Sequence, residues 1–158
     1  MLNRVDLQPS KWRCVVWNIF CGLWIRLFLP LSTYRYFRSA WHAKDVRRRV
    51  GVNEKRHPHA MGNVFLSYSF PTHSSSEKPC IFFGDWTYEH QITQRVKKAV
   101  DFFERKAINR EYEVLRHADH VWTTFPLIAA KMSGEYGLER VSVARILNLP
   151  VSNDERNY

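Results

Sequence analysis

The sequence predicts an α/β protein with a mostly parallel sheet and flanking helices, preceded by a basic, Trp-rich helical segment. From residue 63 onward, apolar strand-like runs alternate with helical periodicities in the order strand, strand, helix, strand, helix, strand. The predicted strands include short, continuous apolar runs, which are typical of parallel sheets covered on both faces. The 158 residues are 45% hydrophobic and 15% aromatic, which is enough for a folded core and excludes a disordered chain.

Positive charge is concentrated in the first 60 residues. They hold 12 of the 24 Lys and Arg residues but 3 of the 15 Asp and Glu residues, so the net charge of +9 belongs to this part. Such asymmetry indicates a polyanion or an anionic membrane surface as a partner. We therefore expect a basic helical segment over residues 1–60, an α/β domain over 61–150, and a tail or linker over 151–158.

Residues 11–31 predict the first helix, and their apolar run is too short for the roughly 20 residues of a membrane span. No small-residue cleavage site of a signal peptide follows this run. On a helix, Lys11, Asn18, Gly22 and Arg26 would form one narrow polar stripe, with apolar and Trp side chains elsewhere. Two interpretations stay open, a helix at a membrane–water interface and a helix buried in the core.

Residues 35–50 predict a second helix that carries many arginines and stops at Gly51, followed by a polar loop to residue 62. No helix-turn-helix, zinc or single-strand-binding signature accompanies the arginines, so lipid headgroups are favoured over nucleic acid. The expected contacts to anionic lipid or to an acceptor phosphate are Arg35, Arg38, Arg47, Arg48 and Arg49.

The elements of the α/β domain follow from hydrophobic periodicity and turn residues. Alternating side chains predict a strand before Pro71, and a short apolar run predicts a buried strand after Pro79. Pro126 suits the first position of a helix that ends at Gly137. The predicted strands are 63–70, 80–83, 120–125 and 141–147, and the predicted helices are 93–117 and 126–137.

Residues 84–91 predict a polar, aromatic loop directly after the strand at 80–83. In open parallel sheets, ligands bind at the carboxyl ends of the strands, so this loop is the candidate site. Asp85 and His90 are the candidate catalytic residues, because they could orient a hydroxyl group or take its proton. The candidate substrate-binding residues are Gly84, Trp86, Tyr88 and Glu89. The alternative is a solvated loop whose aromatic side chains pack against the long helix.

No metal or cofactor site is expected in this chain. His117, Asp119 and His120 flank a helix-to-strand junction and lack the spacing of a zinc site. The three cysteines are too few and too scattered for a metal cluster or a disulfide framework, so a reducing compartment is expected. Neither a G-x-G-x-x-G motif after a strand nor a P-loop is present.

The stretch LRHADHVWTTFPLIAAKMSGEYGLERVSVARILNLP resembles the end of the N-terminal domain in retaining glycosyltransferases that use nucleotide sugars and consist of two Rossmann-like domains. The similar features are Ala118-Asp119 at a helix end, a hydroxyl-rich strand end at Thr124, Tyr136-Gly137, and an Asn-containing turn at Asn148. Upstream, Gly84-Asp85-Trp86 is similar to the acceptor-side loop of that family. The resemblance covers roughly residues 63–150.

The resemblance implies a Rossmann-like, acceptor-side domain that helps to transfer a sugar to a lipid-linked or cell-surface glycan. In that family the donor nucleotide is held mostly by a second domain, so this chain is expected to need a donor-binding partner and to be inactive alone. The family's glycine-rich opening strand is not recognisable before residue 60. The expected location is the cytoplasmic face of the membrane, as a peripheral protein. The alternative is a non-catalytic membrane-surface or scaffold protein that docks a partner subunit.

Overall fold

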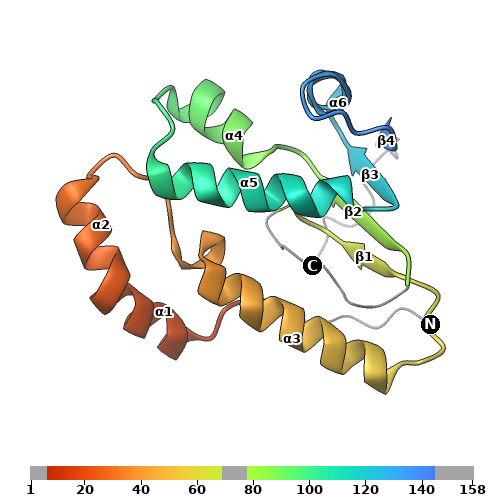
Figure 1. Ribbon diagram of the computed structural model, residues 1–158, viewed down its shortest axis with the longest axis horizontal. Coiled ribbons are helices and arrows are strands. Elements are labelled where there is room, and N and C mark those ends of the chain that lie inside the picture. The colour runs from red at the N-terminus through yellow and green to blue at the C-terminus, as the bar shows by residue number, and fades with distance from the viewer. Residues whose placement is uncertain (1–6, 69–77, 145–158) are drawn as a thin grey trace, which may run out of the picture.

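The computed structural model describes residues 7–68 and 78–144. One sheet of four parallel strands has the order β1-β2-β3-β4 (Figure 1). The strands are β1 (Asn63–Phe65), β2 (Cys80–Gly84), β3 (His120–Thr123) and β4 (Val141–Val143). The predicted α/β class, with a parallel sheet and flanking helices, is therefore confirmed, and the arrangement is compatible with a Rossmann-like fold.

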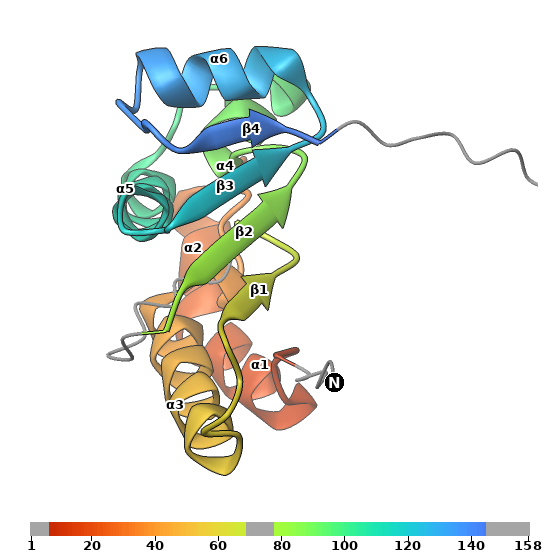
Figure 2. The same cartoon turned by 90° about the vertical axis from the view of Figure 1, so that its right-hand side faces the viewer.

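The main core lies between one face of the sheet and three helices, α3 (Ala40–Arg56), α5 (Phe102–Arg116) and α6 (Pro126–Gly134). In Figure 2 the strands lie side by side, with α6 beyond β4 and α3 near the β1 end. Phe65, Phe82 and Val121 occupy neighbouring strands and are buried in this core. Alternate residues point the other way, and Val64 and Trp122 are exposed.

The N-terminal helical stretch consists of α1 (Lys11–Trp17), a π-helical turn η1 (Asn18–Gly22) and α2 (Leu23–Phe28). A Cβ at Gly22 would lie 2.7 Å from the Asn18 Oδ1 atom, so glycine suits this turn. Trp17 and Ile25 pack into a second core cluster with residues of η3 and α5. Within residues 7–68 and 78–144, no helix is long and apolar enough to cross a bilayer.

The prediction for the second helix is wrong at both ends. A short 3-10 helix, η2 (Tyr36–Arg38), precedes α3, and the side chain of Ser39 caps α3 by accepting a hydrogen bond from the His42 N–H (3.2 Å). The helix then continues through Gly51 to Arg56. Gly51 therefore does not end the helix. Pro58 disfavours helical backbone at His57, which explains why α3 ends at Arg56.

The long helix predicted over residues 93–117 is also wrong, because two helical segments share this region. The first comprises α4 (Tyr88–His90) and the π-helical segment η3 (Gln91–Val96), and it ends where Lys97 adopts a left-handed conformation with φ of 56°. The second, α5, begins with a capping box between Asp101 and Glu104. The prediction of residues 84–91 as a loop therefore fails from Tyr88 onward.

The other predictions in the α/β domain agree with the structure in type and differ in length. β2 and β3 confirm the strands expected at 80–83 and 120–125, and Pro126 occupies the start of α6. α6 ends at Gly134, before Gly137, which has a positive φ of 58°. β1 and β4 are three residues each, so the strands predicted over 63–70 and 141–147 are too long: the chain turns at residues 66–68, and residue 144 lies outside β4. The rest of these predicted strands, 69–70 and 145–147, lies outside the described residues.

Candidate functional site

The candidate site lies where β2 and β3 end side by side. Gly84 pairs with Thr123 in the sheet register, so the segments that follow them leave the same edge. The Thr124 Oγ1 atom donates a hydrogen bond to the Asp85 Oδ1 atom over 2.7 Å. This bond joins the two segments and fixes the Asp85 carboxylate at the carboxyl ends of the strands.

Three rings form an aromatic surface beside this carboxylate. The Trp86 ring stacks on the His90 ring, with 4.7 Å between centroids and 21° between planes. Its centroid also lies 4.5 Å from that of Phe125, the residue after Thr124. Trp86 is 43% exposed and Phe125 is 38% exposed, so both offer apolar surface to a ligand. Asp85, Trp86 and His90 are thus the predicted site residues that the structure gathers at this edge.

The His90 ring packs against the Trp86 ring, and His90 is 7% exposed. Its backbone N–H donates to the Thr87 Oγ1 atom (3.2 Å), which caps α4. Burial, and then the nearby Lys131 ammonium, lower the pKa of His90 below its ordinary value. The imidazole is therefore neutral near pH 7 and can act as a proton acceptor.

Gly84 gives the strand end its close packing. The Tyr68 ring lies over it, and a Cβ at this position would meet three ring atoms at 3.0–3.1 Å. The Tyr68 hydroxyl lies 2.7 Å from the Gly84 carbonyl oxygen and 2.5 Å from the Trp122 carbonyl oxygen. It can therefore donate a hydrogen bond to either β2 or β3. Gly84 is therefore a positioning residue in this structure, and its lack of a side chain lets Tyr68 tie β2 to β3.

The structure does not bring Tyr88 to the aromatic surface. Tyr88 is 2% exposed, its hydroxyl lies 3.0 Å from the Thr33 Oγ1 atom, and the Arg38 guanidinium covers its ring at 4.0 Å. This is a correction to the expected substrate wall, and its cause is the helix that starts at Tyr88. As the first residue of α4, Tyr88 lies on the buried side of the helix, whereas in the predicted loop it would have been exposed.

Glu89 also serves the fold. Its Oε2 atom accepts a hydrogen bond from the Tyr136 hydroxyl (2.7 Å) and lies 3.5 Å from the Lys131 Nζ atom, and its Oε1 atom lies 3.4 Å from Arg105. Burial raises the pKa of Glu89, but the Tyr136 hydrogen bond and Lys131 outweigh burial and hold the pKa below its ordinary value. Glu89 stays ionised and joins α4 to α5 and α6.

The five arginines predicted to bind anions fall into two groups. Arg35, Arg47 and Arg48 are exposed, whereas the Arg38 side chain is 9% exposed and pairs with Glu111 across 2.8 Å. Arg48 and Arg49 both contact Asp45, over 3.2 and 2.9 Å. The buried ion pair removes Arg38 from any external anion site, which corrects the expectation for that residue.

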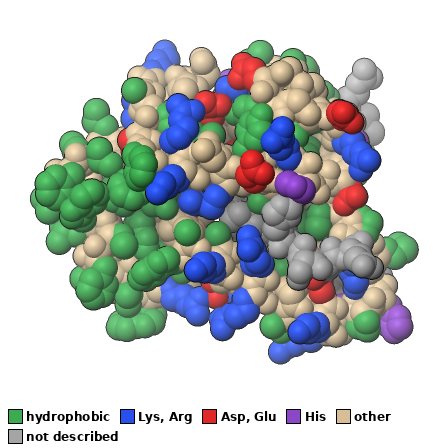
Figure 3. All heavy atoms as spheres, viewed as in Figure 1, with side chains coloured by type: hydrophobic (Ala, Val, Ile, Leu, Met, Phe, Trp, Pro, Cys, Tyr) green, Lys and Arg blue, Asp and Glu red, His purple; other side chains and the backbone are tan. Residues whose placement is uncertain are grey.

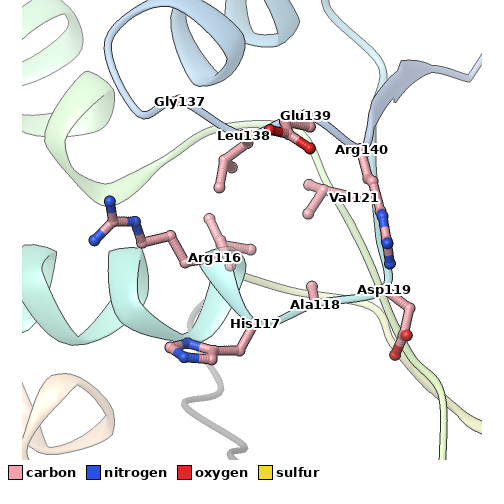
Figure 4. A pocket seen from close by; sticks show the side chains of 10 residues that line it. Arg116, His117, Ala118, Asp119, Val121, Gly137, Leu138, Glu139 and Arg140 are labelled. Atoms are coloured by element: carbon pink, nitrogen blue, oxygen red, sulfur yellow. The ribbon is translucent and has the colours of Figure 1, made fainter.

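A hollow of about 500 Å³ lies at the opposite edge of the sheet, where β3 begins. Figure 4 shows Val121 and Leu138 pointing into it, while Arg116 extends away. The Asp119 Oδ2 atom accepts the Cys80 N–H over 2.7 Å, so this carboxylate joins β2 to the start of β3. None of the predicted catalytic, substrate-binding or anion-binding residues lines this hollow.

Sequence reasoning missed Phe125 as part of the aromatic surface and Thr124 as the partner of Asp85. The sequence did contain a signal, since Thr123 and Thr124 follow the apolar run of β3. In a parallel sheet, residues that follow β3 lie beside residues that follow the neighbouring strand β2. The contact of Tyr68 with the two strand ends had no comparable signal.

Searches against protein-family models, curated protein sequences and solved structures found no match for this chain. The class of protein therefore rests on the fold and the site geometry. They define a parallel α/β protein with a carboxylate and an aromatic surface at the carboxyl ends of its strands.

Proposed function

We propose that this protein is the acceptor-side domain of a glycosyltransferase that transfers a sugar from a nucleotide-sugar donor to a lipid-linked or cell-surface glycan. The observation that supports this best is the cluster of Asp85, Trp86, His90, Thr124 and Phe125 at the strand ends. An aromatic surface suits the apolar face of a sugar ring, and a carboxylate accepts hydrogen bonds from its hydroxyls.

The proposed chemistry uses the same groups. The acceptor hydroxyl attacks the anomeric carbon, the bond from that carbon to the nucleotide diphosphate breaks, and the diphosphate leaves with the bonding electrons. The hydroxyl proton passes to Asp85 or to His90, whose neutral imidazole suits a base. Trp86 and Phe125 hold the acceptor ring in place beside them.

The proposal includes a donor-binding partner domain and a peripheral location at the cytoplasmic face of a membrane. The resemblance in residues 63–150 implies that the donor nucleotide binds to such a domain, so the proposed transfer needs both parts. The basic first 60 residues support an anionic membrane surface as a further partner.

A non-catalytic membrane-surface or scaffold protein is the second candidate. The exposed apolar side chains of α1 and α2 support it, because they form an interaction surface away from the strand ends, although both candidates include a membrane surface. The two candidates differ at the strand ends, since a scaffold has no need of a sugar-binding surface there.

Replacing Trp86 by alanine tests the proposed sugar site. The full chain is incubated with a printed array of oligosaccharides, and its affinity for the best-bound glycan is then measured. We expect Trp86→Ala to weaken this affinity by about tenfold, because stacking contacts of this size are worth about 1–1.5 kcal/mol. Trp41→Ala is the matched control, since Trp41 is 53% exposed on α3. Equal effects of the two substitutions, or no bound glycan, would contradict the proposal.

A further inference from the structure

The stretch Lys11–Phe28 has apolar side chains on both of its faces. Its inner face packs in the second core cluster through Trp17 and Ile25, each 3% exposed. The opposite side, which we name the outer face, carries large apolar side chains that are each at least 58% exposed. These are Trp12, Ile19, Phe20, Leu23, Leu27 and Phe28. A helical stretch that is apolar on its outer face as well as on its buried face needs a second apolar environment.

The outer face continues across the π-helical turn. A regular helix has 3.6 residues in a turn, whereas the π-helical turn η1 uses one more. Ile19 and Phe20 on η1 are exposed, as are Trp12 on α1 and Leu23 and Leu27 on α2, so the exposed apolar surface includes all three segments. In Figure 3 green side chains gather over the left-hand side of the molecule, where Figure 1 places α1 and α2.

Positive charge borders the outer face. Lys11 and Arg26 are exposed near the two ends of the helical stretch, and Arg35 is exposed just beyond it. The sequence from residue 7 to residue 44 contains no Asp or Glu. The next carboxylate, Asp45, is 5% exposed and contacts Arg13, Arg48 and Arg49. The complement of this surface is therefore both apolar and anionic.

An anionic phospholipid bilayer has that chemistry, with acyl chains beneath phosphate headgroups. Trp side chains favour the boundary between the two, and Lys and Arg extend toward the headgroups. The stretch is about 27 Å long and is buried along its inner face, so it fits a position in the plane of the interface. A helix that lies in this way exposes one apolar face to lipid and keeps the other on the protein.

We propose that the outer face docks this protein on an anionic phospholipid bilayer, with the helical stretch in the membrane plane and Lys11, Arg26 and Arg35 at the headgroups. The inference rests on the peripheral location proposed above and names the surface and the lipid class. It does not depend on sugar transfer, which concerns another part of the molecule.

Vesicle flotation of the full chain tests this inference. The vesicles are phosphatidylcholine alone, or phosphatidylcholine with about a third phosphatidylglycerol, at low and high salt. The variant Trp12→Ser/Phe20→Ser/Leu27→Ser removes outer-face side chains that are 69–73% exposed. The control Met61→Ser/Leu66→Ser/Leu127→Ser removes side chains that are 68–92% exposed outside this helical stretch. Thermal unfolding of both variants checks that each is folded.

We expect the wild type and the control to bind anionic vesicles, and the outer-face variant to bind at least about tenfold more weakly. High salt or removal of phosphatidylglycerol should also weaken binding. Equal vesicle binding by the two variants would overturn the outer face as the docking surface and leave the peripheral location standing. Absence of wild-type binding at low salt would overturn both. A wild type that is dimeric in solution, ignores vesicles and becomes monomeric in the outer-face variant would identify a second copy as the occupant.

Discussion

Replacing Arg38 by alanine is expected to lower the free energy of unfolding by about 3–5 kcal/mol near pH 7. The Arg38 Nη1 atom pairs with the Glu111 Oε2 atom at 2.8 Å, and the two side chains are 9% and 6% exposed. The Glu111 Oε1 atom also accepts the Tyr88 N–H over 2.7 Å. Without Arg38, a buried carboxylate loses its cation and Tyr88 loses the guanidinium that covers its ring.

The pH dependence of this loss identifies Glu111 as its cause. Burial raises the pKa of Glu111 above its ordinary value, and removal of Arg38 raises it further. The carboxyl group of the variant therefore takes up its proton at a higher pH than that of the wild type, so the stability difference should be smaller at about pH 5 than at pH 7. Urea unfolding at both pH values measures this change.

Two further variants separate the ion pair from general effects of losing an arginine. Arg35→Ala should change stability by less than about 1 kcal/mol, because Arg35 is exposed and its guanidinium bonds to the Ser32 and Tyr34 carbonyl oxygens. Arg38→Met/Glu111→Gln should recover much of the loss, since no buried charge remains unpaired and an acceptor for the Tyr88 N–H is kept. An Arg38→Ala variant as stable as Arg35→Ala would contradict this account.

Replacing Glu104 by alanine is expected to cost about 3 kcal/mol. The Glu104 side chain is fully buried and holds the start of α5 to the segment after α2. Its Oε1 atom accepts the Thr33 N–H over 2.6 Å and the Thr33 hydroxyl over 2.7 Å. Its Oε2 atom accepts the Lys98 ammonium over 2.5 Å and the Asp101 N–H over 3.0 Å. Alanine would leave these donors without their acceptor.

Glu104 should also contribute to the acid sensitivity of the protein. Burial raises its pKa, but Lys98, the Asp101 N–H and Thr33 outweigh burial and leave the pKa below its ordinary value. A carboxyl group whose pKa is lowered by folding adds stability above its unfolded-state pKa of about 4.3, and that stability is lost as the pH falls below this value. Below about pH 4.3, unfolding of Glu104→Gln should depend less steeply on pH than that of the wild type. Parallel curves would contradict this role.

Local residue patterns predicted the strands and the start of α6, because these elements depend on nearby residues. The run at 80–83 became β2, and Pro126 marked a helix start. The break between η3 and α5 also had a local signal, since Asp101 and Glu104 have capping-box spacing. The apolar periodicity continued across that break and outweighed the signal in our prediction.

The burial of Arg38 and Glu104 could not be predicted from local patterns. Arg38 and Glu111 are 73 residues apart, and Thr33 and Glu104 are 71 residues apart. Each contact exists because tertiary packing brings α5 against the segment between α2 and α3. At the candidate site, the position of Asp85 and Trp86 followed from the rule for strand ends, whereas the inward turn of Tyr88 depended on a helix start that the prediction placed later.

Chemical-shift mapping of the full chain with a bound oligosaccharide tests the central claim most directly. The isotope-labelled protein is titrated with the best-bound glycan from the array, and the shifts of its backbone amides and Trp indole N–H groups are followed. We expect the largest changes at Asp85, the Trp86 indole, His90, Thr124 and Phe125. Changes centred on the hollow at the start of β3, or spread without a centre, would contradict a sugar site at the strand ends.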